Sequence, residues 1–427
     1  MGGPLWGIPP SKRVSPLRGT PLSPKVGRIL LGVTGSIAAY KAPLIVRALQ
    51  KEGHEVQVLL TRGGAHFVSA QALETLSRQP VIEDLWGRAP TGEVAWTQHI
   101  DLARKVDAFL IAPATAHTIA KLANGFCDDL LTAVFLATRR PALIAPAMET
   151  QMYRHPVVQA NLRRLRKLPH VTIIPPGKGY LASGARGEGR LASLQRLLLA
   201  VERALTPPLL KGRRVLITLG ATREYWDAVR FLSNASTGQM GLALARAAFL
   251  LGADQIHLLV AHTETPIPKN LYTITHTPTA ESMANAFMQV YRDYDWLILA
   301  AAVSDYTFAQ PIPSKHKKSG GPLMLTLQPT PDILAWAGAH KLPHQVLIGF
   351  ALESDPDPAR AREKLLRKGS DWIAHNLISP QTGMSAPTNA LTLLSRFGHE
   401  HPIPLAPKPA VALEMLKFIA HAHASLV

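Results

Sequence analysis

Short apolar runs alternate with amphipathic segments along most of the chain, a pattern that predicts β-strands joined by helices. The first unit is an apolar strand at 28–33, a glycine turn, a helix at 40–53 and a second strand at 55–61. Alternation of this kind indicates a parallel sheet covered by helices on both faces. The following elements are expected to be strands at 108–112, 141–145 and 171–176 and helices at 116–137 and 194–205.

The second half of the chain repeats this pattern after a break at Pro207 and Pro208. Its predicted strands begin at Val215, Ile256, Trp296 and Val346, and its last helix covers 411–420. We therefore expect an α/β protein of two fused Rossmann-like parallel-sheet domains, at 28–208 and 209–427. Residues 1–27 contain several Pro, Gly, Ser, Lys and Arg and no acid, which predicts a disordered basic leader.

Composition narrows the class of protein further. The 427 residues are 47% hydrophobic, enough for two cores of ordinary size. The longest apolar runs, such as 296–303, have the length of strands, so no membrane span is expected. The single cysteine, Cys127, excludes an internal disulfide and a cysteine-cluster metal site and suits a reducing cytoplasm.

The net charge of +17 raises the question of nucleic-acid binding. The basic residues form separate runs at 163–167, 211–214 and 315–318, with no aromatic residues interleaved. This distribution favours a solvated basic surface with local anion sites over a nucleic-acid interface.

Polar residues follow the first strands at the positions where a sheet of this kind binds ligands. Gly35, Ser36 and Ala38 open a helix, and the backbone amides there can bind a phosphate. The third glycine and the later acid of the dinucleotide fingerprint are missing, so a mononucleotide is favoured over NAD. Thr61 and the segment 112–118 add hydroxyls at neighbouring strand ends.

The segment 215–246 predicts a second anion site, because a strand, a polar loop and a helix start follow one another. The loop carries Arg223, Arg230 and Asn234, and glycines begin the helix. Asp305, at the end of another buried strand, is suited to a ribose or a metal. Further lysines, which could clamp a triphosphate, are Lys315, Lys317, Lys318, Lys364 and Lys368. The glycine-rich stretches 177–193 and 306–322 are predicted to be flaps.

From about Arg28 to the C-terminus, these motifs resemble the bifunctional phosphopantothenoylcysteine decarboxylase and phosphopantothenate–cysteine ligase of coenzyme A biosynthesis. In the front half the resemblance rests on GVTGSIAAYK at 32–41, APATAHTIAKLANG at 112–125 and PAMETQM at 146–152. It implies FMN as cofactor. The positions that match FMN contacts are Gly35, Ser36, Ile37, Ala38, Thr61, Ala114 and Thr115, and those that match substrate contacts are Met148, Glu149 and Met152.

A lone histidine is more often structural than catalytic, but His99 in WTQHIDLARKVD matches the family's catalytic histidine. The implied chemistry is oxidation of the substrate thiol by FMN, loss of carbon dioxide, and return of the electrons with a proton. Two positions depart from the family. Glu149 stands where an asparagine binds the substrate carboxylate, and Ser183 stands where a flap cysteine supplies the proton.

In the back half, the resemblance implies a CTP-dependent ligase that forms an acyl-cytidylate, which the amine of cysteine then attacks. Catalytic positions of the family are matched by Arg230, Asn234, Ala302 and Lys315. Its CTP contacts are matched by Leu299, Ala300, Ala301, Asp305, Lys315, Pro331, Asp332, Ile333, Leu334, Phe350, Lys364 and Lys368. Lysines and Mg2+ would neutralise the developing phosphate charge.

The expected partners are the small molecules 4'-phosphopantothenate, cysteine and CTP, with Mg2+, and no nucleic acid, membrane or resident metal site. The resemblance also implies a homo-oligomer built from trimers of the front domain. Two alternatives stay open. One is an active ligase whose front domain binds FMN, is impaired by Glu149 and Ser183, and serves assembly. The other is a basic nucleic-acid-binding protein.

Overall fold

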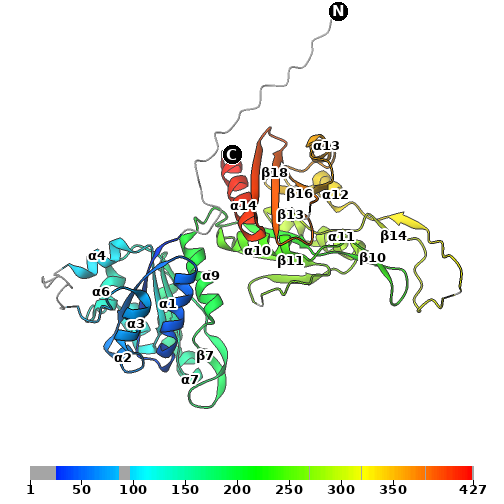
Figure 1. Cartoon of the computed structure of the whole chain (residues 1–427). Coiled ribbons are helices and arrows are strands. Elements are labelled where there is room, and N and C mark those ends of the chain that lie inside the picture. Colours follow the sequence, from blue (N-terminus) through cyan, green and yellow to red (C-terminus); the bar gives the residue numbers. More distant parts are fainter. Residues whose placement is uncertain (1–25, 86–96, 269, 319, 380, 426–427) are drawn as a thin grey trace, which may run out of the picture. The chain divides into compact units, whose positions relative to one another are not determined.

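The computed structural model describes residues 26–85, 97–268, 270–318, 320–379 and 381–425 (Figure 1). The described chain divides into two compact units, one ending at Pro207 and the other beginning at Pro208. We call these the front unit and the back unit. The predicted leader lies outside the described residues except for Val26 and Gly27.

The front unit is built on a five-stranded parallel sheet with the strand order β2-β1-β3-β4-β5. Its strands are β1 (Arg28–Val33), β2 (Glu55–Leu60), β3 (Ala108–Ala114), β4 (Ala142–Pro146) and β5 (Val171–Ile173). Its helices are η1 (Ile37–Lys41), α1 (Ala42–Lys51), α2 (Arg62–Ala65), α3 (Ala70–Ser77), α4 (Gln98–Lys105), α5 (Ala116–Asn124), α6 (Leu130–Ala137), α7 (Thr150–Arg154), α8 (Pro156–Arg166) and α9 (Leu194–Leu205). The parallel sheet predicted from the alternating pattern is therefore present.

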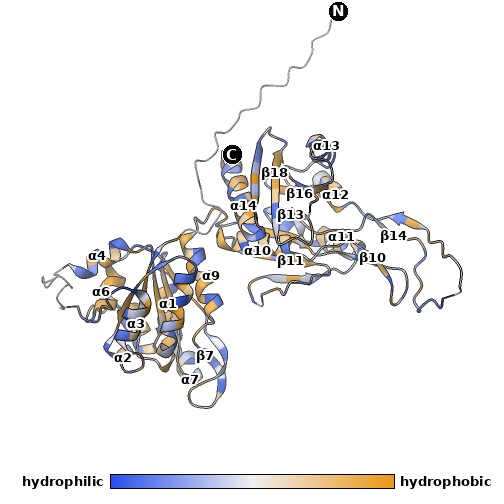
Figure 2. Cartoon of the chain, viewed as in Figure 1, coloured by the Kyte–Doolittle hydropathy of each residue, from blue (hydrophilic) through white to orange (hydrophobic). Residues whose placement is uncertain are grey.

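Both faces of this sheet are buried, because successive strand residues point to opposite sides. On β1, Leu31 joins the core that α1 and α9 cover, whereas Leu30 joins the core that α5, α6 and α8 cover. Figure 2 shows the hydrophobic colouring along these strands. The result is a rigid layer whose strand ends can hold a ligand site.

Two predictions for the front unit need correction. The helix expected at 116–137 is broken into α5 and α6, because Gly125 ends α5 with a φ of 74° and Asp129 caps α6 by accepting the Thr132 amide at 2.8 Å. The flap predicted at 177–193 contains an antiparallel hairpin of β6 (Gly177–Tyr180) and β7 (Arg186–Arg190).

The back unit is built on an eight-stranded sheet with the order β12-β11-β8-β13-β16-β17-β18-β19, parallel up to β17 and antiparallel beyond it. The strands are β8 (Arg214–Leu219), β11 (Gln255–Val260), β12 (Thr273–His276), β13 (Trp296–Leu299), β16 (Val346–Glu353), β17 (Trp372–Leu377), β18 (Thr388–Ser395) and β19 (Glu400–Pro407). The helices are α10 (Gln239–Leu250), α11 (Ala280–Val290), η2 (Tyr291–Asp293), α12 (Ile333–His340), α13 (Ala359–Arg367) and α14 (Lys408–Ala424).

Helices cover both faces of this sheet as well. Leu216 of β8 belongs to the core under α11 and α12, whereas Leu219 of the same strand lies against Gly241 of α10. A side-chain carbon at Gly241 would lie 2.4 Å from Leu219 Cβ, so only glycine lets α10 approach the strand this closely. Helix α14 packs beside α10.

The sequence located β8, β11, β13 and β16 but missed the other strands of this sheet. β19 carries Pro402, Pro404 and Pro407, which argue against a strand, yet it is the edge strand, where a missing backbone donor is tolerated. Two small hairpins were also missed. They are β9 (Arg223–Tyr225) with β10 (Phe231–Ser233), and β14 (Tyr306–Phe308) with β15 (Leu327–Pro329). β14 begins the predicted flap at 306–322, and β15 follows it.

Within the described ranges, no helix has both the length and the apolar character needed to cross a membrane.

Candidate functional site

The front unit has a cavity of about 670 Å³ at the carboxyl ends of its central strands. Small-molecule sites typically have about 300–1,000 Å³, and open parallel sheets bind ligands at this edge. Of the residues predicted to contact FMN, those that line the cavity are Gly35, Ser36, Thr61 and Thr115, and those that do not are Ile37, Ala38 and Ala114. Met148 and Met152 also line it, whereas Glu149 does not.

Two turns of the front cavity touch each other through glycines. A side-chain carbon added to Gly35 would lie 3.0 Å from the backbone of Gly63, and one added to Gly63 would lie 3.1 Å from Gly35. The turns that follow β1 and β2 are therefore close enough to form one backbone-lined wall. A bare backbone of this kind can approach a phosphate.

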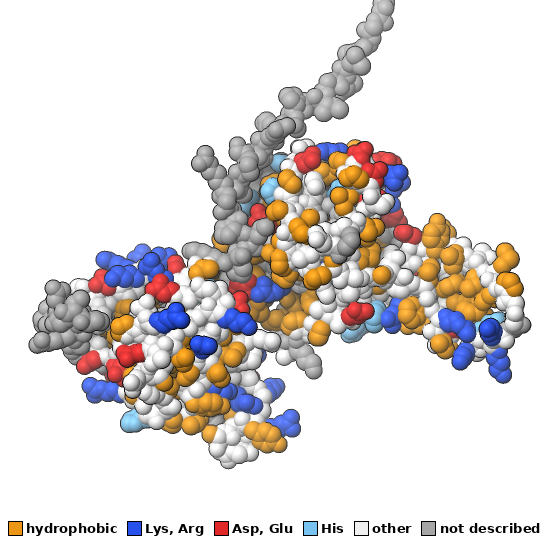
Figure 3. All heavy atoms as spheres, viewed as in Figure 1, with side chains coloured by type: hydrophobic (Ala, Val, Ile, Leu, Met, Phe, Trp, Pro, Cys, Tyr) orange, Lys and Arg blue, Asp and Glu red, His pale blue; other side chains and the backbone are white. Residues whose placement is uncertain are grey.

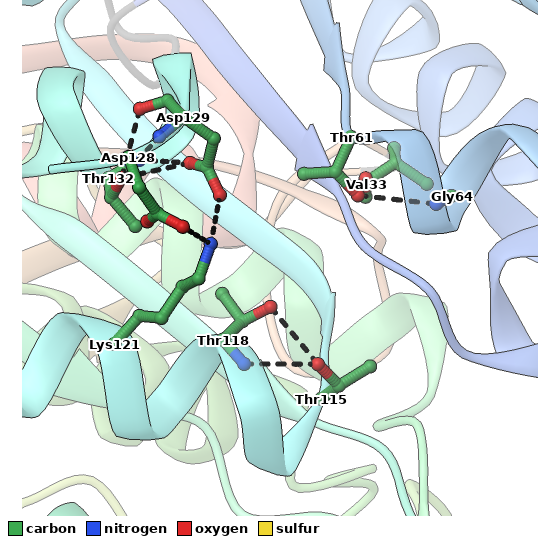
Figure 4. A network of polar contacts seen from close by, with 9 residues as sticks. All are labelled: Val33, Thr61, Gly64, Thr115, Thr118, Lys121, Asp128, Asp129 and Thr132. Carbon is green, nitrogen blue, oxygen red and sulfur yellow. Dashed lines mark hydrogen bonds and ion pairs between the residues drawn. The ribbon is translucent and has the colours of Figure 1, made fainter. Parts of the chain in front are cut away.

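Hydroxyls at the strand ends fix the helices that begin at this cavity (Figure 4). Thr61 Oγ1 accepts the Gly64 amide at 3.2 Å and donates to the Val33 carbonyl at 3.2 Å. Thr115 Oγ1 accepts the Thr118 amide at 3.1 Å. The predicted hydroxyls thus act as helix caps, and they hold first-turn amides that have no intrahelical partner at the cavity wall.

One lysine on the front cavity wall is already neutralised. Lys121 Nζ lies 2.7 Å from carboxylate oxygens of both Asp128 and Asp129 (Figure 4). Burial alone would lower the pKa of Lys121, but the hydrogen bonds and charges of the two aspartates outweigh it and raise this pKa. The cavity therefore offers a ligand backbone amides, hydroxyls and apolar side chains such as Met148 more than free positive charge. That set fits the neutral ring and single phosphate of FMN.

The two positions that depart from the family are in direct contact. Ser183 Oγ donates to Glu149 Oε2 at 2.7 Å, and Glu149 Oε1 accepts the Thr150 amide at 3.0 Å. Side-chain carbons at Gly187 and Gly189 of β7 would lie 2.1 Å from Thr150 Oγ1 and from the Met148 carbonyl. The β6–β7 hairpin therefore packs tightly against the segment that follows β4. The hydrogen bond between Ser183 and Glu149 joins the tip of the hairpin to this segment.

The predicted catalytic histidine lies apart from these groups. His99 is the second residue of α4 and is not among the residues that line the front cavity of its own chain. His99 therefore does not join the predicted FMN residues that line this cavity.

The back unit has a cavity of about 660 Å³ along the carboxyl ends of β8, β13 and β16. It brings together nearly all of the residues predicted to contact CTP. Those lining it are Leu299, Ala300, Ala301, Asp305, Pro331, Asp332, Ile333, Leu334, Phe350, Lys364 and Lys368, together with the predicted catalytic residues Asn234 and Ala302. Arg230 and Lys315 do not line it.

The lysines of the back cavity are held differently from Lys121. Lys364 Nζ donates to the Phe350 carbonyl at 2.9 Å, and burial lowers its pKa although Glu353 and Asp305 act on it in the opposite sense. Among the described residues no carboxylate comes within ion-pair distance of it. Lys368 forms an ion pair with Asp332, the residue that caps α12.

Arg230 and the loop that carries Lys315, Lys317 and Lys318 are both held by a different residue, Asp227. Burial opposes ionisation of Asp227, but the backbone amides of Arg230, Val229 and His316, together with the Arg230 charge, outweigh it and lower the pKa to about 2. The guanidinium of Arg230 pairs with the Asp227 carboxylate and also donates to the His316 carbonyl at 3.3 Å. Arg230 is thus fixed beside the residue that follows Lys315.

Asn234 lies at the mouth of the back cavity. Its amide nitrogen donates to the Val303 carbonyl at 3.1 Å, which orients the side chain beside Ala302. A larger residue than alanine there would occupy the cavity. Among the described residues no group of three or more His, Cys, Asp and Glu side chains is arranged to hold a metal.

Sequence reasoning missed several residues that line this cavity, namely Thr218, Ser236, Met240, Asn376, Met384, Asn389 and Lys408. Asn376 and Asn389 lie on strands that the sequence pattern did not locate, β17 and β18. A strand assignment for 372–377 and 388–395 was the signal that could have found Asn376 and Asn389, since polar residues at strand ends are site candidates.

Comparison with known proteins gives consistent matches in both units. Residues 21–206 match the family model described as Flavoprotein, and residues 210–422 match the DNA/pantothenate metabolism flavoprotein C-terminal domain. The coenzyme A biosynthesis bifunctional protein of Bacillus subtilis is 39% identical over 396 residues, covering 92% of this chain and 96% of the relative.

Two further matches are a relative and a solved structure. A protein named cysteine/cysteine sulfinic acid decarboxylase, from an unknown prokaryotic organism, is 38% identical over 359 residues, which is 83% of this chain and 99% of that relative. A crystal structure of the C-terminal domain of a coenzyme A biosynthesis bifunctional protein covers 51% of this chain and 99% of its own, with 33% identity and a TM-score of 0.44.

Proposed function

Since the chain belongs to the family of coenzyme A biosynthesis bifunctional proteins, we propose that it catalyses two successive steps. The back unit joins 4'-phosphopantothenate to cysteine at the expense of CTP, and the front unit decarboxylates the phosphopantothenoylcysteine to 4'-phosphopantetheine. The observation that carries the proposal is a cavity in the back unit, where segments from 234 to 368 supply polar and basic groups that such a reaction needs.

In these terms the front domain is 28–208, the ligase domain is 209–427 and residues 1–27 are a leader. The two activities need different ligands, and the two cavities differ accordingly. The front cavity is lined by bare backbone, hydroxyls, methionines and a lysine that is paired with aspartates, whereas the back cavity carries Lys364 and Lys408, which donate to backbone carbonyls.

For the ligase, we assign the phosphates of CTP to the basic side chains and the ribose hydroxyls to Asp305. Lys364 and Lys368 line the cavity, and Lys315 sits on the loop beside Arg230. A free carboxylate is a poor electrophile, so it first attacks the nucleotide to give an acyl-cytidylate and pyrophosphate. Arg230 and Asn234 stabilise that intermediate, and Mg2+ enters bound to the triphosphate.

For the decarboxylase, bound FMN supplies an oxidant for the substrate thiol and later returns the electrons. The chain's own residues bind and orient the reactants. Gly35 and Ser36 present backbone at the start of η1, and Thr61 and Thr115 complete that wall, whereas Ile37, Ala38 and Ala114 are assigned to FMN by the resemblance alone. Met148 and Met152 in the cavity bind the substrate, and Glu149 is a substrate contact by the resemblance alone.

Both substituted positions bear on the rate of this second step. Glu149 accepts hydrogen bonds on both carboxylate oxygens, from Ser183 and from the Thr150 amide. A charged Glu149 repels the carboxylate of the substrate, and the Ser183 hydroxyl is a weaker acid than a thiol. We therefore propose a working but slow decarboxylase.

Assembly of front units would bring His99 to a flavin. His99 does not line the cavity of its own chain, so its proposed catalytic role requires the cavity of a neighbouring copy. An exposed apolar stripe of Ile37, Tyr40 and Leu44 runs along η1 and α1 beside the predicted FMN turn. Such a stripe supports a subunit contact there, in line with a homo-oligomer built from trimers of the front domain.

One relative suggests a second candidate for the front unit, decarboxylation of free cysteine or its sulfinic acid. The decisive experiment distinguishes the products. Purified protein is incubated with 4'-phosphopantothenate, cysteine, CTP and Mg2+, and the products are identified by mass spectrometry.

We expect phosphopantothenoylcysteine to appear first and 4'-phosphopantetheine to follow. Cysteamine formed from cysteine without CTP would favour the second candidate. If neither CMP nor a condensed product forms while the protein is folded, the ligase proposal is wrong. If arrest occurs at phosphopantothenoylcysteine, the front unit is a flavin-binding assembly module.

A further inference from the structure

Lys408, the first residue of α14, places a buried positive charge in the wall of the back cavity. Only 2% of the residue is exposed to solvent. Its Nζ donates to the Met384 carbonyl at 3.0 Å, and burial lowers its pKa. No carboxylate among the described residues forms an ion pair with it. Burying an ammonium group with a single neutral partner costs free energy, and a bound anion would offset that cost.

The neighbourhood of Lys408 also favours an anion. Thr237 Oγ1 donates to the same Met384 carbonyl at 3.4 Å, so the lysine meets the segment that leads into α10. Ser236, Gly238, Met240 and Gly241 of this segment line the cavity. α10 starts at Gln239, and its first-turn amides have no intrahelical acceptor, so a buried ammonium and a helix N-terminus point at one place.

Two amides in the same cavity wall have unused polar groups. Asn376 at the end of β17 and Asn389 in β18 are at least nine-tenths buried, and for neither side-chain oxygen do the described residues provide a donor. Buried polar atoms are normally paired. A ligand with hydrogen-bond donors next to its anionic group would satisfy these oxygens.

The 381–387 loop is held over this end of the cavity by its own contacts. Ser385 Oγ donates to the Ala235 carbonyl at 2.9 Å, in addition to the bonds that Met384 accepts from Lys408 and Thr237. The loop thus has other anchors than Lys408. A neutral hydrogen-bond donor could hold the Met384 carbonyl as well as Lys408 does, so this contact alone does not explain a buried positive charge.

From these contacts we infer that Lys408, with the N-terminus of α10, forms a phosphate subsite of the ligase cavity that none of the predicted nucleotide contacts includes. The inference rests on the proposed ligase function. The phosphate comes either from the nucleotide or from the phosphate ester of 4'-phosphopantothenate, the two anionic substrates of that reaction.

The test replaces the charge and keeps the hydrogen bond. Lys408→Gln retains a donor for the Met384 carbonyl, Lys408→Met removes both donor and charge, and Lys417→Met on the same helix is the matched control outside the cavity. Each full-length protein is titrated by calorimetry with CTP plus Mg2+ alone and with 4'-phosphopantothenate alone. Melting temperatures are recorded in parallel.

We expect both Lys408 variants to bind one of the two ligands about 10- to 100-fold more weakly, the range for hydrogen bonds to charged groups. The other ligand is bound as by the wild type, and Lys417→Met is unchanged for both. The ligand that loses affinity identifies the source of the phosphate.

Two outcomes overturn the inference. One is a folded Lys408→Gln protein that binds both ligands as the wild type does. The other is equal weakening of both ligands together with a lower melting temperature, which would assign Lys408 to the loop alone. A wild-type protein that binds neither ligand would contradict the proposed ligase function instead.

If neither variant folds, crystals of the wild type with each ligand decide the matter. A phosphate oxygen within hydrogen-bond distance of Lys408 Nζ supports the subsite, and phosphates more distant than that in both complexes exclude it.

Discussion

The two cavities have almost the same volume, about 670 and 660 Å³, but the front lysine and two of the three back-cavity lysines are held in opposite ways, while Lys368 is paired with Asp332. In the front cavity Lys121 is paired with two aspartates, and its pKa is raised. In the back cavity Lys364 and Lys408 donate to backbone carbonyls, and burial lowers the pKa of both.

This difference shows which charged partners each cavity still lacks when no ligand is bound. In the front cavity the charge of Lys121 is already met by two carboxylates, so this lysine has little charge left for a ligand. In the back cavity Lys364 and Lys408 form no ion pair with a described residue, and a polyanion would supply the missing partner. Cavity size alone would not have separated the two functions.

The largest effect is expected from removing a lysine of the back cavity. Lys364→Met should lower kcat/KM of the ligase for CTP by about 100-fold or more, because one charge-assisted contact to a phosphate is lost. The melting temperature of the ligand-free protein should stay the same or rise, since replacing a partly buried ammonium by an apolar chain removes a desolvation cost. Steady-state kinetics and thermal melts provide the two measurements.

Lys417→Met on α14 is the control for this variant, because it removes a lysine of the same unit that does not line the cavity. Flavin absorbance of the Lys364→Met protein should match that of the wild type. Unchanged ligase kinetics in a folded Lys364→Met protein would contradict the view that the back cavity is organised around unmet positive charge.

A smaller effect, in the opposite direction, is expected at the contact between Glu149 and Ser183. The double variant Glu149→Asn with Ser183→Cys removes a repelling charge and introduces a stronger acid. The rate of 4'-phosphopantetheine formation from phosphopantothenoylcysteine should rise about 10- to 100-fold, within the range of general acid catalysis. Stopped assays with product quantified by mass spectrometry measure it.

The single variants separate the two causes. Glu149→Asn should mainly lower KM, since it removes like-charge repulsion, and Ser183→Cys should mainly raise kcat. Because the two side chains are hydrogen-bonded, their effects should not add. If the double variant is no faster than the wild type, the pair does not limit the front reaction.

The pattern of the sequence predicted the fold class, whereas most residues of the back cavity were predicted by the family resemblance. Asp305 was also a candidate from the pattern itself, because it follows the buried strand β13, and parallel strands bring such ends to one edge. Lys408 was missed because a lysine that begins a helix normally lies in solvent, and only the packing of α14 beside α10 buries it.

The pairing of Lys121 with carboxylates could not be predicted from the sequence, for a related reason. Lys121 lies in α5 and Asp128 in the turn between α5 and α6, so their contact depends on the break at Gly125, which the helix predicted over 116–137 did not contain. The bond between Ser183 and Glu149 likewise depends on how the β6–β7 hairpin docks. The resemblance identified Glu149 and Ser183 as departures from the family. It placed them in two separate motifs, so their contact was not predicted.

The smallest effect is expected from the front lysine. Lys121→Met leaves Asp128 and Asp129 without their cation, so the front unit should lose about 1–2 kcal/mol of stability, less than for a fully buried pair because Asp128 is largely exposed. FMN affinity, measured by flavin fluorescence, should change less than about twofold, because a neutralised lysine contributes little to binding an anion. The stability effect would thus be opposite in sign to that of Lys364→Met, although both variants replace a cavity lysine by methionine. If Lys121→Met instead releases FMN without destabilising the front unit, Lys121 binds the ligand of the front cavity, as we propose for the lysines of the back cavity. The contrast between the two cavities would then be wrong.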